Sequence, residues 1–232
     1  MSLIALAKLH SLPVKGFLPP AEAERLFELG VMAAPLGPML EIGSYCGKST
    51  LYLGSACKQA GAVLFCVDHH QGSEEQQPGE AFHDPELVNP ATGEMDTLPF
   101  FRETLRRADL SDCVVPLVAP SHLAAAGWST PLSLVFIDGG HTFTAAVTDY
   151  VSWSSFLKPG GLLVIHDIFE RPEEGGQAPY YIYNMALSSG LYEELPMKGS
   201  LGALRKKSGL QLVPQPARPV APGFPGRKGF LA

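Results

Sequence analysis

The sequence has few charged residues, since lysine, arginine, aspartate and glutamate make up only 17% of its 232 positions. Basic residues are the scarcer kind, at 17 against 23 acidic ones, which gives a net charge of −6. A protein that binds nucleic acid needs a basic surface to neutralise phosphates, so we expect no nucleic-acid partner. Long apolar runs are also missing, and none approaches the ~20 residues of a membrane-spanning helix, so we expect no membrane partner.

Cysteine is scarce as well, and its four residues stand singly rather than in the C-x-x-C spacing of metal and redox sites. They are Cys46, Cys57, Cys66 and Cys113. We therefore expect free thiols in a reducing cytoplasm rather than disulfides or a zinc site. Residues 1–10 are apolar, but they follow no basic segment and precede no clear cleavage site, so we interpret them as a short helix.

Apolar residues make up 46% of the chain, and their pattern changes repeatedly between that of a strand and that of a helix. Short continuous apolar runs are typical of parallel strands covered on both faces, and segments with helical periodicity follow them. The predicted strands are 38–42, 62–67, 113–118, 132–137 and 162–165, and the predicted helices are 20–34, 48–59, 99–108 and 143–156. This alternation predicts an α/β fold with a doubly wound, mainly parallel sheet and helices on both faces.

Two helices and one turn can be predicted in more detail. In the first helix, Leu26, Phe27 and Val31 are expected to share one buried face. Phe143 should likewise pack in the core, on the same side of its helix as Tyr150. The segment 158–161, Lys-Pro-Gly-Gly, predicts a sharp turn before the strand at 162–165.

The chain divides by composition into three parts. Residues 1–35 are predicted to form N-terminal helices, and 36–207 a cofactor-binding domain. Within that domain, residues 69–98 carry seven acidic side chains, no lysine or arginine and no periodicity, so we expect a long insertion loop. The segment 208–232 holds five prolines, four glycines and no acid, and is predicted to be a disordered tail.

The first strand ends in a glycine loop that allows two interpretations. The loop contains Gly-Lys-Ser, as a P-loop does, but only three residues separate Gly43 from Gly47, where a P-loop has four. Alternatively, Glu41-x-Gly43-x-x-x-Gly47 is the first element of a nucleoside site, completed by Asp68 after the second strand, since a carboxylate there can accept both hydroxyls of a ribose.

Four segments in order, 40–49, 67–68, 134–141 and 157–167, resemble the successive motifs of class I S-adenosylmethionine-dependent methyltransferases. They look most similar to the small-molecule O-methyltransferase branch that includes the macrolide-sugar and catechol enzymes. The resemblance spans roughly residues 36–206 and implies S-adenosylmethionine as cofactor. It also implies a Rossmann-like sheet of seven strands, mostly parallel, with an antiparallel last strand at 202–206.

The resemblance further implies which residues hold the cofactor. Those near its methionine part would lie in the glycine loop, Asp68 would bind the ribose, and Ser121 with His122 would lie near adenine. The full set is Glu41, Gly43, Ser44, Tyr45, Gly47, Ser49, Asp68, His69, Ser121, His122 and Asp138.

On the acceptor side, metal-dependent members of that branch have an acid at the position of Asp138 and two acids or amides at the next strand end. Here the second pair is His166-Asp167, so the resemblance implies a metal site of Asp138, His166 and Asp167. Magnesium prefers oxygen ligands, and a mixed carboxylate and imidazole set suits a transition metal better, so the divalent metal is left open. His141 could be a further metal ligand, and His141 or His166 would be the catalytic base. The structural alternative is an Asp–His pair that only fixes the loops.

The sequence thus predicts an enzyme that moves a methyl group from S-adenosylmethionine to a hydroxyl of a small molecule, such as a sugar or a polyketide-like secondary metabolite. The alternatives are a P-loop-type ATP-binding protein and a cofactor-binding module without catalysis. The run 175–183 holds three tyrosines after two glycines, and it would either wall an acceptor site or pack a helix on the sheet. Whether the chain forms a homo-oligomer is left open.

Overall fold

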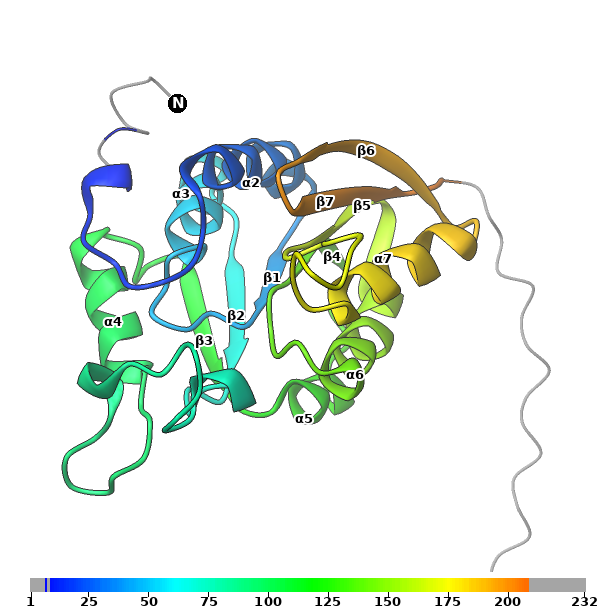
Figure 1. The fold of residues 1–232 in the computed structure, drawn as a ribbon. Coiled ribbons are helices and arrows are strands. Elements are labelled where there is room, and N and C mark those ends of the chain that lie inside the picture. The colour runs from blue at the N-terminus through cyan, green and yellow to red at the C-terminus, as the bar shows by residue number, and fades with distance from the viewer. Residues whose placement is uncertain (1–6, 8, 209–232) are drawn as a thin grey trace, which may run out of the picture.

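The computed structural model describes residue 7 and residues 9–208. Its centre is a seven-stranded sheet in the order β3-β2-β1-β4-β5-β7-β6 (Figure 1). The strands are β1 (Met39–Ile42), β2 (Leu64–Asp68), β3 (Val114–Val118), β4 (Leu132–Ile137), β5 (Leu157–Ile165), β6 (Tyr192–Lys198) and β7 (Leu201–Lys206). Strands β1 to β5 are parallel, and β7 pairs antiparallel with both β5 and β6. The predicted seven-stranded, mostly parallel sheet with an antiparallel last strand is therefore confirmed.

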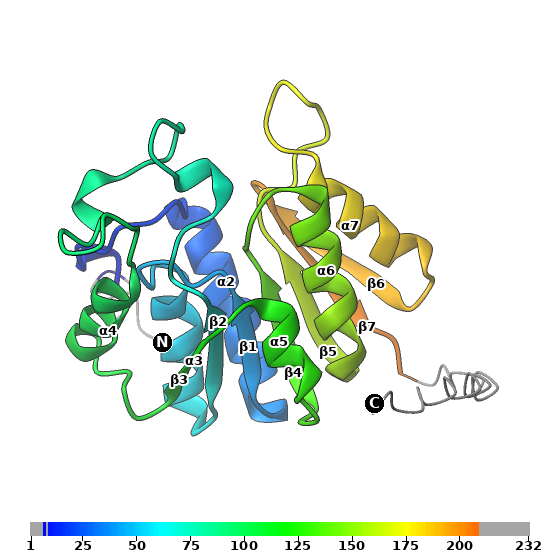
Figure 2. The same cartoon turned by 90° about the horizontal axis from the view of Figure 1, so that it is seen from below.

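Helices cover both faces of this sheet, as a doubly wound fold requires (Figure 2). Helices α2 (Pro20–Ala33), α3 (Thr50–Ala60) and α4 (Leu98–Arg107) pack on one face, and α5 (Ser121–Ala126), α6 (Phe143–Trp153) and α7 (Ala178–Ser188) on the other. Four short 3₁₀ helices complete the elements: η1 (Ala34–Leu36), η2 (Glu74–Gln76), η3 (Pro85–Leu87) and η4 (Ser154–Phe156). Among the described residues, none of the helices combines the length and apolarity that crossing a membrane requires.

The central strands are mostly apolar because both of their faces are covered. In β4, Leu134 and Phe136 pack on the α2–α4 side, while Val135 and Ile137 pack on the α5–α7 side. Successive side chains of a strand point to opposite faces, so a continuous apolar run fills two cores at once. This buried strand fixes the position of the residues that follow it.

Three details of the sequence prediction are wrong. Val31 is 42% exposed, and Leu29 and Ala33 take the core face of α2 instead. Phe143 is 54% exposed, because it lies in the first turn of α6 before the helix packs against the sheet. The segment 158–161 is part of β5 rather than a turn before it, since an irregularity in the β4–β5 register accommodates its glycines.

The insertion between β2 and α4 has few regular elements, but it is attached to the body of the protein. It contains η2, η3 and a bridge between Val88 and Met95, and Leu87 and Met95 are buried together with Cys46. Lys15 of the N-terminal segment forms ion pairs with Asp84 and Glu86 of the insertion. Of the predicted disordered tail, all but Ser208 lies outside the described residues, as does most of the helix predicted at 1–10.

Candidate functional site

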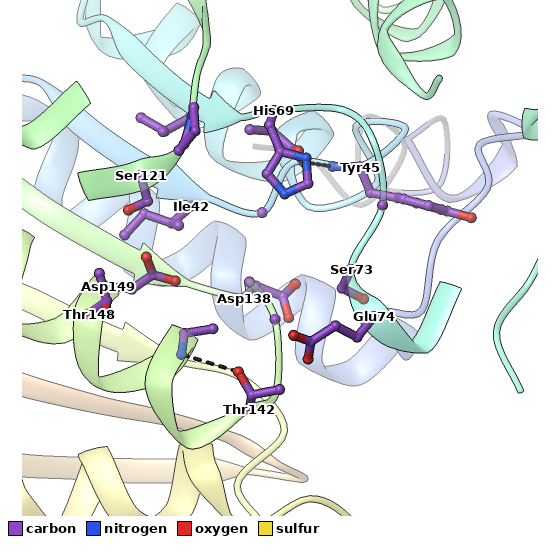
Figure 3. A pocket seen from close by; sticks show the side chains of 18 of the residues that line it. Ile42, Tyr45, His69, Ser73, Glu74, Ser121, Asp138, Thr142, Thr148 and Asp149 are labelled. Atoms are coloured by element: carbon purple, nitrogen blue, oxygen red, sulfur yellow. Dashed lines mark hydrogen bonds between the residues drawn. The ribbon is translucent and has the colours of Figure 1, made fainter. Parts of the chain in front are cut away.

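Two adjoining cavities lie at the carboxyl ends of the parallel strands, where open α/β sheets bind their ligands. The first has a volume of about 470 Å³, and Figure 3 shows Asp138, Asp149 and His69 around it. The second has a volume of about 390 Å³. Their common wall consists of Gly43, Tyr45, Ser73, Gln76, Asp138 and Gly139.

Gly43 explains how the common wall is built. Its φ is +84°, and a Cβ atom there would lie 2.1 Å from the carbonyl oxygen of Asp138 and 2.8 Å from the Cα of Gly139. Only glycine permits both this backbone conformation and this approach. The loops after β1 and β4 therefore touch, and Asp138 faces both cavities.

Asp68, at the end of β2, organises one side of the first cavity. Its Oδ2 accepts a hydrogen bond from the Tyr45 amide at 2.8 Å, and its Oδ1 accepts one from the His70 amide at 2.7 Å. Tyr45 and His70 both have positive φ values, 47° and 60°, so the carboxylate holds two strained loop residues. Each carboxylate oxygen retains a second acceptor site, so Asp68 can still bind ligand hydroxyls.

A second acid of this cavity, Asp149, was missed by the sequence analysis. It lies on the buried stripe of α6 with Ala146, Tyr150 and Trp153, and burial raises its pKa to about 6. Ser121, at the start of α5, hydrogen-bonds with Asp149 and also accepts a hydrogen bond from Trp153 Nε1 at 2.8 Å. An acid within an apolar helical stripe was the signal that could have identified it.

The second cavity has a polar end made by Asp138, His141 and Asp167. His141 Nε2 lies 3.2 Å from Asp167 Oδ2, and its Nδ1 lies 3.2 Å from Oε2 of Glu75 in the insertion. One ligand atom from each of Asp138, His141 and Asp167 lies within 4.8 Å of the others. Asp167 has a φ of 57°, a strained conformation that is typical of functional sites.

The charges in this cluster are strongly coupled. The hydrogen bond to Asp167 raises the pKa of His141 to about 9. Burial raises the pKa of Asp138, whereas hydrogen bonds from His141 and His166 outweigh burial and lower the pKa of Asp167. Two carboxylates and one imidazole around a common point fit a divalent cation, and the nitrogen ligand favours a transition metal over magnesium.

His166 does not join this cluster on the cavity side, which differs from the sequence expectation. It is only 2% exposed, its Nε2 lies 2.6 Å from Glu22 Oε2, and its Nδ1 lies 3.1 Å from Asp138 Oδ1. The reason is the alternation of side chains at the end of a strand: His166 points toward α2, and Asp167 points into the cavity. Both ring nitrogens of His166 are therefore engaged by internal carboxylates.

The other predicted site residues separate into those that line a cavity and those beneath it. Asp68, His69, Ser121 and His122 line the first cavity, Ser44 and Ser49 line the second, and Gly43, Tyr45 and Asp138 line both. Glu41 is fully buried below the loop, where it accepts hydrogen bonds from Thr50 and Cys66. Gly47, with a φ of +91°, packs on Thr104 of α4.

Two further acids near the charged cluster, Glu22 and Glu75, were not predicted. Glu22 is buried against His166 and also accepts a hydrogen bond from the Ser200 amide at 2.7 Å. Its place in the buried stripe of α2, four residues before Leu26, was an available signal. Glu75 lies in a segment without helical or strand periodicity, so the sequence offers no signal for its position.

Residues 40–168 match the family model described as a methyltransferase domain. Among solved structures, the chain is similar to the O-methyltransferase TomG from Streptomyces achromogenes, involved in tomaymycin synthesis, in complex with SAM (16% identity over 90% of this chain and 92% of that chain, TM-score 0.55). It is similar to the O-methyltransferase from Bacillus cereus in complex with SAH (17% identity, 88% of each chain, TM-score 0.56). It is also similar to the O-methyltransferase NovP (13% identity, 82% and 81%, TM-score 0.60). At these identities the likeness to solved structures shows a common fold.

Proposed function

We propose that this chain transfers a methyl group from S-adenosylmethionine to a hydroxyl group of a small molecule. It belongs to the methyltransferase family, because residues 40–168 match the model of that family's domain. The observation that carries the proposal is the pair of cavities that share a wall at Gly43 and Asp138. Two reactants bound on either side of that wall meet at the carboxyl ends of β1 and β4. The family match favours this function over the P-loop alternative.

The first cavity has the features that S-adenosylmethionine requires. Its volume of about 470 Å³ lies in the range of cofactor sites. Asp68 offers acceptors for the ribose hydroxyls, and Ser121 and His122 line the end near the start of α5 where adenine would bind. The methionine part would then extend toward Gly43. The complexes of TomG with SAM and of the Bacillus cereus enzyme with SAH support this cofactor.

The second cavity would hold the acceptor. As the hydroxyl oxygen attacks the methyl carbon, the new C–O bond forms while the S–C bond breaks, and the hydroxyl proton leaves. Positioning two reactants in this way is a large part of the catalysis. Asp138 lines both cavities and its pKa is raised by burial, which supports a role in receiving that proton.

We also propose that Asp138, His141 and Asp167 hold a divalent metal, with His141 in place of the His166 expected from the sequence. Glu75 accepts from the other nitrogen of His141 and would orient the ring, as carboxylates do for metal-binding histidines. A metal held there would acidify the acceptor hydroxyl. His141 without a metal carries a proton at neutral pH, because its pKa is about 9, so it would be a poor base.

Ligand binding and methyl transfer test the function directly. A hundredfold excess of S-adenosylhomocysteine over its Kd should stabilise the protein by about 2.7 kcal/mol, and ATP should not. A melting shift with ATP and none with S-adenosylhomocysteine or S-adenosylmethionine would favour the P-loop alternative. Exhaustive chelation should abolish methyl transfer, and Mn²⁺ should restore it. Mn²⁺ binding measured by electron paramagnetic resonance should weaken in His141→Ala.

The remaining expectations are also proposals. An acceptor cavity of about 390 Å³ supports a small molecule as the partner. All four cysteines are buried as free thiols, which supports a cytoplasmic location.

A further inference from the structure

Four aromatic rings line the acceptor cavity in addition to the charged cluster. Phe17 of the N-terminal segment contacts Phe82 of the insertion edge to face, with ring centroids 5.2 Å apart. The ring of Tyr45, from the loop after β1, lies 6.1 Å from that of Phe17. Phe169, from the loop after β5, lines the same cavity. Four separate segments thus each contribute one ring to this cavity.

Two of these rings are largely exposed rather than packed in the protein core. Phe17 is 60% exposed and Phe82 is 46% exposed, although burying a phenylalanine side chain is strongly favourable. The two segments that carry them are held together by the ion pairs of Lys15 with Asp84 and Glu86. The polar contact therefore keeps two apolar rings at a cavity, where a ligand could cover them.

Several polar side chains of this cavity already make one contact within the protein. Lys48 Nζ donates to the Val14 carbonyl, Gln76 Oε1 accepts from the Ser73 amide, and Glu174 forms an ion pair with Arg171. Glu75 contacts His141. A sugar needs a hydrogen-bond partner for each buried hydroxyl, so it would compete with these contacts. An aromatic ring needs only the apolar and aromatic surface that the cavity provides.

We propose that the acceptor is an aromatic hydroxyl compound, a phenol or naphthol, rather than a sugar. Its ring would pack against Phe17, Tyr45, Phe82 and Phe169, with its hydroxyl directed to Asp138 and His141. A phenolic hydroxyl has a pKa near 10, as tyrosine does, so it loses its proton far more readily than an aliphatic hydroxyl. This inference rests on the proposed function and specifies its substrate class.

Three acceptors test the substrate class: 2-naphthol, decahydro-2-naphthol and methyl glucoside. The first two share a carbon skeleton and differ in aromaticity, while the third is a sugar. Binding to the full-length protein loaded with S-adenosylhomocysteine is measured by calorimetry. The expected order of affinity is 2-naphthol first, its saturated analogue at least ~3-fold weaker, and the glucoside at least ~30-fold weaker, because the saturated alcohol cannot stack and the glucoside has little apolar surface to place against the rings.

Two variants test the aromatic wall. Phe17→Leu and Phe82→Leu should each weaken 2-naphthol binding about 3- to 10-fold, because leucine remains apolar but cannot stack. Phe100→Leu is the matched control, since Phe100 is also an exposed phenylalanine, at 37%, but lies on α4 and does not line the cavity. All three variants should bind S-adenosylhomocysteine as the wild type does, which shows that they are folded.

The outcomes separate the two proposals. If methyl glucoside or the saturated alcohol binds as tightly as 2-naphthol, or if neither Phe17→Leu nor Phe82→Leu weakens 2-naphthol binding, the aromatic acceptor is wrong while the methyltransferase function stands. If S-adenosylhomocysteine does not bind the wild-type protein, the proposed function fails, and the aromatic acceptor fails with it.

Discussion

The two cavities differ in the origin of their walls. The first is lined by strand ends and the loops after them, such as Asp68, Ser121 and Asp138, together with the start of the insertion and one side of α6, and all of its lining residues lie within the segment that matches the methyltransferase domain. The second takes Phe17 and Phe169 from outside that segment and Phe82 from the insertion. The parallel sheet thus supplies a cofactor site, and peripheral segments close an acceptor site against it.

This difference has a physical reason. The ends of parallel strands have fixed positions because the sheet is buried on both faces, so residues after them are placed precisely. The peripheral segments are held by a few contacts, including the ion pairs of Lys15. Loops can change without altering the core, which lets one cofactor site serve different acceptors. Variants should therefore affect either the cofactor or the acceptor, and the following predictions test that separation.

The largest effect is expected at the charged end of the acceptor cavity. Asp167→Asn should lower turnover by at least ~100-fold, because it removes one carboxylate of the proposed metal and acceptor site. Since Asp167 does not line the first cavity, the Kd for S-adenosylhomocysteine should change less than about 2-fold. Methyl-transfer kinetics and calorimetry measure both quantities. Glu173→Gln, on the exposed part of the same loop, is the control. A large loss of cofactor affinity in Asp167→Asn would contradict the separation.

At Asp68 the effect is expected on cofactor binding instead. Asp68→Asn should weaken S-adenosylhomocysteine binding about 10- to 100-fold, because a charged acceptor for the ribose hydroxyls is lost. Asp68→Ala should lower the melting temperature more than Asp68→Asn, since alanine leaves both the Tyr45 and the His70 amide without an acceptor, whereas asparagine keeps one acceptor oxygen. Calorimetry and thermal denaturation distinguish the two variants. An unchanged Kd in both would remove Asp68 from the cofactor site.

A smaller effect, on stability, distinguishes Asp149 from Asp68 within the first cavity. Burial raises the pKa of Asp149 to about 6, so the folded state keeps a proton that the unfolded state releases at lower pH. Stability from this group is complete below pH ~3.9 and is lost as the pH rises through about 6. Asp149→Asn has no carboxyl group to titrate and so does not show this loss. The difference in free energy of unfolding, variant minus wild type, should therefore increase by about 1 kcal/mol from pH 5 to pH 8. Parallel stability curves in urea denaturation would contradict the buried, protonated carboxyl.

The smallest effect is expected at the contact between the peripheral segments. Lys15→Gln should raise the KM for the acceptor about 2- to 5-fold and leave cofactor binding unchanged, because partly exposed ion pairs contribute little. Amide exchange of residues 72–88 should become faster in this variant. Lys58→Gln is a matched control, since Lys58 also pairs with two acidic residues, Asp109 and Asp112, away from both cavities. Equal effects of the two variants would show that the Lys15 contact has no special role.

The sequence alone predicted the five parallel strands and their alternation with helices, and it selected the residues proposed for the cofactor side of the site. Strands and helices have local periodicities, so a window of a few residues predicts each element. Gly43, Asp68 and Asp138 could be selected because each directly follows a predicted strand, and parallel strands end at one edge. No knowledge of distant contacts was needed for these residues.

Only the tertiary structure decided the acceptor side. His141 lines the cavity with Asp167, whereas His166 contacts Asp167 from the buried side and is paired with Glu22, which is 144 residues away. Glu75 reaches His141, and Phe82 reaches Phe17, from an insertion that has no periodicity. Such contacts form between segments that are distant in the chain and lack a repeating pattern. Their positions follow from how the segments pack on the finished sheet, and a local reading of the sequence carries no information about that packing.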